Sequence, residues 1–255
     1  MCRMLALRSA RPDTLDWLVL DAPNGLKALS HEHRHGWGIA QYVGRRPVVA
    51  LGTLPAWEDP EFEDVARSVE GDCLLAHVRR ASMGEVRVEN SHPFHNGRWL
   101  FAHNGTVRGF EKLREKLDSL IANEFRALLA GNTDSERCFG LFLTCLARLG
   151  ALEQPPLEVI ACALAETIAL LRELSPDPTT ALTFLATDGI CLVGARSGEK
   201  ELGYLANPGE RLLIASEAPA SDVPWTQLED GEVVGADARL RIHRWRMDGG
   251  CLRSR

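Results

Sequence analysis

The order of patterns along this 255-residue chain predicts an α+β fold with two sheets. Mostly strand-like segments run from residue 3 to residue 105, helical patterns cover 109–174, and short strands follow Pro178. Strands grouped before and after a helical block, without regular alternation of strand and helix, are typical of this class. We expect one domain over residues 1–255, because the linker-like proline segments at 155–156 and 175–178 are too short to force two.

The beginning of the chain predicts a strand, a helix and a loop. We expect the strand over residues 3–8 and the helix over 13–20, with Asp13 or Thr14 near its N-cap. The stretch 22–35 is polar and indicates a loop.

The next segments predict strands around one helix. Residues 36–43 and 46–51 flank Gly44-Arg45, which is typical of a hairpin. Residues 60–70 begin with a proline at a first-turn position and predict a helix. Two further apolar strand patterns each end in polar residues, at 72–80 and 98–105.

The second half predicts long helices and then strands. We expect a helix over 109–130 that is broken near Asn123, and two more helices over 134–149 and 157–174. Beyond Pro178, short apolar segments are separated by Gly, Asp and Pro, which predicts an antiparallel meander.

Charge and cysteine usage exclude several classes of protein. The net charge of -6 and the pI near 5.8 argue against partners such as nucleic acid or an anionic membrane. No apolar run reaches about 18 residues, and the start lacks a signal-peptide pattern, so we expect a cytoplasmic protein. The seven cysteines form no C-x-x-C pair, which argues against a disulfide scaffold or a zinc ribbon. The alternating histidines of 31–35 raise the possibility of a metal, but no further ligand completes a site, and we expect neither metal nor cofactor.

Cys2 is the most informative residue. Removal of Met1 would give Cys2 a free α-amine with a pKa of about 8, which can take up the thiol proton. One residue would then supply both nucleophile and base. On its own, a cysteine directly after the initiating methionine more often has no functional role.

Two polar segments near strand ends are candidates for binding. Arg79 and Arg80 follow an apolar strand, and an arginine there suits a carboxylate ligand. Period-two alternation puts them on opposite faces, so at most one points into a site. His92 precedes a proline, which more often shapes a turn than takes part in chemistry.

Two other segments offer donors and a carboxylate. Asn104 and Gly105 can aim a side-chain amide and a backbone N–H at an oxyanion, although Asn-Gly is also a hairpin signal. A helix follows shortly, which weakens the hairpin interpretation. Thr133 and Glu136 have capping-box spacing, which would explain their segment structurally. Asp134 could instead bind a ligand's ammonium group.

Together these segments resemble the class II glutamine amidotransferases of the N-terminal-nucleophile hydrolase superfamily. The matching elements are Cys2, HGWGIA (35–40), AHVRRAS (76–82), NSHPF (90–94), FAHNGTV (101–107), NTDSE (132–136), ASE (215–217), Trp225 and DGEVV (230–234). The resemblance is strongest to the stand-alone branch of amidotransferases and γ-glutamyl hydrolases. It implies a four-layer αββα sandwich of two antiparallel sheets.

The resemblance also implies roles for individual residues. Cys2 would be the nucleophile, with its α-amine as general base, and Asn104 and Gly105 would form the oxyanion hole. Arg79 would bind the α-carboxylate of the substrate and Asp134 its α-ammonium. Two residues would shape the pocket nearby: His92 and Ser82.

Three functions follow as alternatives. The first is hydrolysis of glutamine or a γ-glutamyl conjugate through a γ-glutamyl thioester. Arg80 and Met83 favour it, since biosynthetic amidotransferases typically have Trp and often His there. The second is a glutaminase subunit that delivers ammonia to a separate synthase partner. The third is a non-catalytic γ-glutamyl binding protein, suggested by the Met1 that precedes Cys2.

Overall fold

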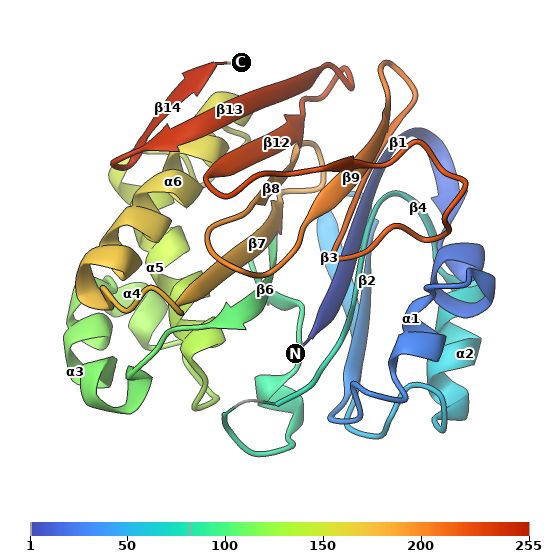
Figure 1. Cartoon of the computed structure of the whole chain (residues 1–255), viewed down its shortest axis with the longest axis horizontal. Coiled ribbons are helices and arrows are strands. Elements are labelled where there is room, and N and C mark those ends of the chain that lie inside the picture. The colour runs from blue at the N-terminus through green and yellow to red at the C-terminus, as the bar shows by residue number, and fades with distance from the viewer. Residues whose placement is uncertain (1, 82, 255) are drawn as a thin grey trace.

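Two antiparallel sheets face each other, and helices cover the outer face of each (Figure 1). The computed structural model describes residues 2–81 and 83–254. Within them each sheet has seven strands, in the orders β11-β9-β10-β1-β4-β2-β3 and β14-β13-β12-β8-β7-β6-β5. This arrangement is the four-layer αββα sandwich that the resemblance implies.

The first sheet joins the start of the chain to a later segment. Its strands are β1 (Arg3–Thr14), β2 (Trp37–Val43), β3 (Arg46–Gly52), β4 (Glu70–Val78), β9 (Gly203–Asn207), β10 (Arg211–Ala215) and β11 (Thr226–Gln227). A helical turn η1 (Trp17–Asp21) and the helices α1 (Leu26–Leu29) and α2 (Pro60–Ser68) cover its outer face.

The second sheet carries the longer helices. Its strands are β5 (Phe94–Asn96), β6 (Trp99–Thr106), β7 (Ala181–Thr187), β8 (Leu192–Ala195), β12 (Glu232–Ala236), β13 (Ile242–Asp248) and β14 (Cys251–Ser254). Its helices are α3 (Phe110–Leu120), α4 (Asn123–Arg126), α5 (Asp134–Arg148) and α6 (Leu157–Leu174). A short turn, η2 (Val88–Asn90), precedes β5.

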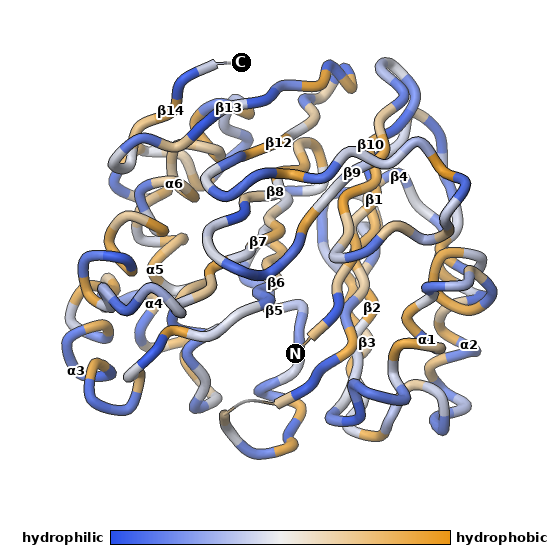
Figure 2. Tube along the Cα trace, in the orientation of Figure 1, coloured by the Kyte–Doolittle hydropathy of each residue, from blue (hydrophilic) through white to orange (hydrophobic). Residues whose placement is uncertain are grey.

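Strand alternation builds three apolar layers. On β1, Met4 and Ala6 pack between the sheets, whereas Leu5 and Leu7 pack under the helices of the first sheet. A third cluster lies between the second sheet and α3–α6. Figure 2 shows the central strands as mostly hydrophobic and α3 and many loops as mostly hydrophilic. Two buried faces per sheet explain why these strands contain long apolar runs.

Several sequence predictions are confirmed. The hairpin around Gly44 joins β2 to β3, with Val43 opposite Arg46. Helix α2 begins at Pro60 with Asp59 as its N-cap, whose side chain accepts from the Glu61 N–H. Helices α5 and α6 match the expected bounds closely, and the expected break near Asn123 separates α3 from α4.

Three local predictions are wrong. The helix expected over 13–20 begins only at Trp17, because β1 continues to Thr14 and Asp13 pairs with Gly71 of β4. The loop expected over 22–35 contains α1. The segment after Pro178 is not one meander, since β9–β11 join the first sheet while β7, β8 and β12–β14 join the second. No helix in the described residues is long and apolar enough to span a membrane.

Candidate active site

Alternation along β1 and β4 directs polar residues into the space between the sheets. Met4 faces that space, and Cys2 extends the same alternation to the start of the chain. On β4, Leu75 faces inward, so His77 and Arg79 follow it on the same side. Figure 1 shows β1 within the first sheet, with the second sheet opposite it.

The Cys2 thiol is half-buried and lies against the backbone of Arg80. The Arg80 N–H donates to Sγ at 3.4 Å, and Sγ is 3.7 Å from the Arg80 carbonyl oxygen. Burial raises the pKa of the Cys2 thiol above its ordinary value. The Arg80 N–H and the Arg79 charge act to lower this pKa, and Asp134 acts to raise it. Arg79 and Asp134 thus both act electrostatically on the thiol.

Arg79 and Arg80 point in opposite directions, as alternation predicts. Arg79 is 3% exposed, and its guanidinium donates to the carbonyl oxygens of Glu85 (2.9 Å) and Met83 (3.0 Å). Burial lowers its pKa, but a guanidinium remains charged. Among the described residues it has no carboxylate within ion-pair distance. Arg80 is exposed and lies 3.9 Å from Glu32.

Asn104 and Gly105 lie inside β6, so the Asn-Gly pair is not a hairpin turn. Asn104 follows Ala102, which faces the inter-sheet layer, and it is 2% exposed. Its Oδ1 is buried and has no partner in the described part of the chain. A Cβ at Gly105 would lie 1.9 Å from the Ala181 carbonyl oxygen, so close strand pairing requires a glycine here.

Asp134 begins α5 and is held by backbone groups. Its carboxylate accepts from the N–H groups of Val107 and Ser135, both at 2.8 Å, and it is 2% exposed. Thr133 caps the helix, since its hydroxyl accepts from the Glu136 N–H at 3.3 Å. The capping box is only half formed, because the Glu136 carboxylate binds the N–H groups at 130 and 131. Within the described residues, no cation is paired with Asp134.

His92 packs against a residue that the sequence analysis did not select. Its ring lies 4.2 Å from the ring of His77 and 4.5 Å from that of Phe94, centroid to centroid. All four nitrogens of the two imidazoles are buried without a partner in the described structure. Burial lowers the pKa of both histidines well below its ordinary value. The period-two rule that selects Arg79 would also have selected His77.

The histidines of 31–35 do not converge. His31 stacks on Trp57, His33 is buried, and His35 accepts from the Ala81 N–H at 2.9 Å. In the part of the chain that is described, no three His, Cys, Asp or Glu side chains gather as metal ligands. Ser82, expected near the pocket, lies outside the described residues.

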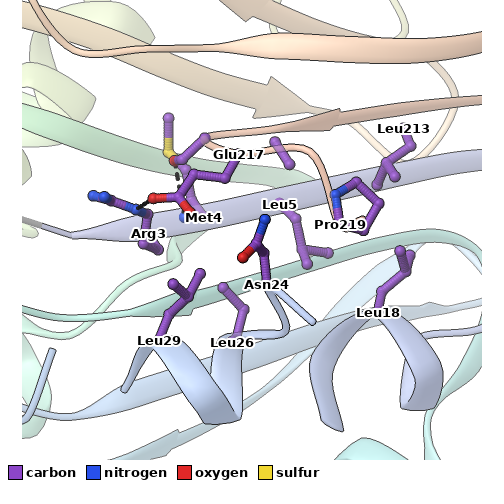
Figure 3. Close-up of a pocket in the computed structure, with 12 residues that line it drawn as sticks. Arg3, Met4, Leu5, Leu18, Asn24, Leu26, Leu29, Leu213, Glu217 and Pro219 are labelled. Carbon is purple, nitrogen blue, oxygen red and sulfur yellow. Dashed lines mark hydrogen bonds and ion pairs between the residues drawn. The ribbon is translucent and has the colours of Figure 1, made fainter. Parts of the chain in front are cut away.

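A separate crevice lies on the outer face of β1 (Figure 3). Leucines from β1, η1, α1 and β10 line it, and the Arg3–Glu217 ion pair lies at one end. Its volume of about 10 Å³ has room for roughly one water molecule. An amino-acid ligand does not fit there. The candidate site is instead the polar end of the inter-sheet layer, where the Cys2 thiol and the Arg79 and Asp134 charges influence one another.

Comparison with known proteins now identifies the family. A family model described as glutamine amidotransferases class-II matches residues 1–209. The chain belongs to this family. It is therefore an enzyme of the glutamine amidotransferase type, an amidohydrolase.

Two relatives illustrate the range of class II amidotransferases to which the chain is similar. It is 32% identical to a gamma-glutamyl-hercynylcysteine sulfoxide hydrolase of Mycolicibacterium smegmatis, over 92% of this chain and 95% of that one. It is 29% identical to the probable glutamine amidotransferase DUG3 of Saccharomyces cerevisiae, over 59% of this chain. That second match spans 47% of the yeast protein, about half its length.

Two solved structures share the fold. A glutamine aminotransferase class-II domain protein from Silicibacter pomeroyi superposes with a TM-score of 0.70 and 28% identity, over 97% of this chain and 100% of that one. Glutamine PRPP amidotransferase from B. subtilis superposes with a TM-score of 0.68 and 20% identity, over 97% of this chain and 49% of that one. The architecture is therefore that of the N-terminal-nucleophile hydrolases.

Proposed function

We propose that this protein hydrolyses a γ-glutamyl amide bond, in glutamine or a γ-glutamyl conjugate, with Cys2 as the nucleophile. The observation that carries the proposal is a pair of buried, unneutralised charges near one thiol. Arg79 and Asp134 are each held by backbone groups, and neither has an oppositely charged partner among the described residues. Unpaired buried charges are costly, and a ligand of opposite charges would remove that cost.

A γ-glutamyl group has the matching charges. Its α-carboxylate would bind the Arg79 guanidinium, and its α-ammonium would bind the Asp134 carboxylate. Its γ-carbonyl would then lie at Cys2, with the Asn104 amide and the Gly105 N–H as oxyanion donors. His92 would border the same pocket, and Ser82 stays a prediction.

The reaction would proceed in two steps. The Cys2 sulfur attacks the γ-carbonyl carbon while its thiol proton passes to the α-amine of the same residue. The tetrahedral intermediate collapses, the C–N bond breaks, and the amine leaves with the proton from the Cys2 ammonium. Water then attacks the γ-glutamyl thioester, with the α-amine as base, which releases glutamate and restores the thiol. The raised pKa of the Cys2 thiol favours a mechanism in which a base takes up the thiol proton.

The mycobacterial relative supports a γ-glutamyl conjugate as substrate, since its printed name describes a γ-glutamyl compound hydrolase. A second candidate function is a glutaminase subunit that supplies ammonia to a synthase. The observation that favours it is the match of residues 1–209 to the family model described as glutamine amidotransferases class-II.

The test is labelling with a diazo-ketone glutamine analogue, followed by intact mass and N-terminal peptide mapping. We expect loss of Met1 and a single adduct on Cys2. Cys2→Ala should take up no label and should lose about 10⁴-fold or more in γ-glutamyl hydrolysis. Full hydrolysis by Cys2→Ala would overturn the proposal. Glutamine binding without turnover by protein trimmed to Cys2 would instead indicate a binding protein.

A further inference from the structure

One buried amide joins the two loops that hold the Arg79 and Asp134 charges. Asn90 is 1% exposed, and its Nδ2 donates to the Glu85 carbonyl oxygen and to Asn132 Oδ1, both at 3.0 Å. Its Oδ1 accepts from the Asn132 N–H at 3.1 Å. Both amide hydrogens and the amide oxygen are therefore engaged.

The first of these bonds reaches the Arg79 side of the site. The Glu85 carbonyl oxygen accepts from Arg79 Nη1 at 2.9 Å and from Asn90 Nδ2 at 3.0 Å. One oxygen thus links the guanidinium to the Asn90 amide. Any shift of residue 85 would move the partner that holds Arg79 in place.

The other two bonds reach the Asp134 side. Asn132 lies two residues before Asp134 and one before the N-cap Thr133. The two hydrogen bonds between Asn90 and Asn132 fix the backbone that leads into α5. The Glu136 carboxylate holds the N–H of Gly131 from the other side.

Close packing around this amide leaves no room for side chains. A Cβ at Gly131 would lie 2.4 Å from Asn90 Oδ1. Gly84 has φ of +74°, and a Cβ there would lie 2.8 Å from Asn132 Oδ1. The two loops therefore pack closely because each has a glycine against the other loop's asparagine: Gly131 against Asn90 and Gly84 against Asn132.

We propose that Asn90 is a positioning residue that holds the carboxylate-binding and ammonium-binding halves of the site at the spacing of one α-amino acid. This inference rests on the proposed function, because it assigns those two roles to Arg79 and Asp134. Asn90 acts through these residues and does not touch the substrate. Its loss should weaken recognition of the glutamyl group and leave the reactivity of the thiol unchanged.

The test compares Asn90→Ala with a matched control, Thr144→Val. Thr144 is also buried on α5, and its hydroxyl accepts from the Ala122 N–H at 3.0 Å, so it joins α5 to a segment away from the site. For Asn90→Ala we expect KM for the γ-glutamyl substrate, and the inhibition constant of L-glutamate, to rise by up to about 100-fold. The rate of Cys2 alkylation by iodoacetamide should stay unchanged. Thr144→Val should change none of the three.

Hydrogen exchange provides a readout without turnover. Asn90→Ala should speed exchange of residues 83–87 and 130–133 together. Asn90→Asp keeps an acceptor for the Asn132 N–H but can donate neither to Glu85 nor to Asn132 Oδ1. It should therefore speed exchange more in 83–87 than in 130–133, where the backbone bond remains. If Asn90→Ala does not fold, Asn90→Asp and Asn132→Ala provide the same comparison.

The outcomes separate the two proposals. A wild-type KM in Asn90→Ala, with exchange unchanged in both segments, would overturn the role of Asn90 while leaving γ-glutamyl hydrolysis intact. A loss confined to kcat and iodoacetamide reactivity would also overturn it. Wild-type protein trimmed to Cys2 that neither hydrolyses γ-glutamyl amides nor binds L-glutamate would overturn the proposed function itself.

Discussion

The two ends of the inter-sheet layer differ in whether their buried polar groups have partners within the protein. At the end where β4 and β6 begin, most such groups have hydrogen-bond partners, and Asp188 Oδ2, which has no hydrogen bond within the described residues, lies in an ion pair with Arg98. The Tyr42 hydroxyl donates to the Arg98 carbonyl oxygen at 2.7 Å, and Cys73 Sγ lies 3.1 Å from Thr187 Oγ1. The Asp188 carboxylate accepts from two backbone N–H groups and forms an ion pair with Arg98 at 3.4 Å.

At the other end of the same strands, partners are missing. The ring nitrogens of His77 and His92 and the Asn104 Oδ1 have none among the described residues. Arg79 has no carboxylate within ion-pair distance in that same part of the chain. An unsatisfied buried polar group costs about 1–3 kcal/mol. The paired end therefore stabilises the fold, whereas the unpaired end holds groups that a ligand or ordered water would satisfy.

The largest expected effect that tests this comparison is the loss of the Asn104 amide. For Asn104→Ala we expect kcat to fall about 100- to 1,000-fold, because one oxyanion donor is removed. Stability should change little, since the Asn104 Oδ1 has no partner to lose in the described structure. Steady-state kinetics and thermal unfolding of the same sample measure both. A kcat near the wild-type value, with a large fall in Tm, would mean that Asn104 stabilises the fold, as the polar groups of the paired end do.

The next effect belongs to the paired end. Tyr42→Phe leaves the Arg98 carbonyl oxygen without its buried donor, so the free energy of unfolding should fall by about 1–3 kcal/mol. Turnover should stay unchanged, because Tyr42 lies at the opposite end of the layer from Cys2. Denaturant unfolding with kinetics in parallel would check this. Lost activity in a stable Tyr42→Phe protein would contradict the division between the two ends.

The last effect is the removal of one of the histidines that give the unpaired end its pH dependence. Burial lowers the pKa of His33 to about 3 and holds the pKa of His77 and His92 well below its ordinary value. The unfolded chain therefore binds more protons below about pH 6.5, and stability is lost as pH falls through that value. Each such histidine contributes about 1.4 kcal/mol per pH unit in this range.

His77→Phe keeps an aromatic ring beside His92 and removes one titrating group. Between about pH 6.5 and pH 5, its free energy of unfolding should fall less steeply than that of the wild type, by about 1.4 kcal/mol per pH unit. Urea unfolding across this range measures both slopes. Equal slopes would mean that His77 does not stay neutral in the folded state.

Local sequence patterns predicted correctly those features that depend on a single helix or strand. The bounds of α5 and α6 follow from helical periodicity, and Thr133 caps α5. The opposite facing of Arg79 and Arg80 follows from the period of a strand. The helix expected over 13–20 failed because pairing of Asp13 with Gly71 extended β1, an interaction between residues far apart in sequence.

The site shows the same limit. Cys2, Asn104 and Asp134 are visible in the sequence because each lies at an element start or inside a distinctive segment. Asn90 also lies in a distinctive segment, NSHPF, but its role is not visible in the sequence. Its partners Glu85 and Asn132 lie in two loops, and Asn132 is 42 positions further along the chain. No period or cap connects such loops, and only their folded positions do.

By itself the sequence determined the fold class and the helical block and indicated the residue types of the proposed site, since propensity, alternation and capping act over a few residues. Only the tertiary structure decided which sheet each late strand joins, which charges remain unpaired, and that Asn90 joins the loops at residues 85 and 132. These features depend on contacts between segments that are distant in sequence. A polar group that is removed from water needs a hydrogen-bond partner, and that partner comes from elsewhere in the chain or from a ligand.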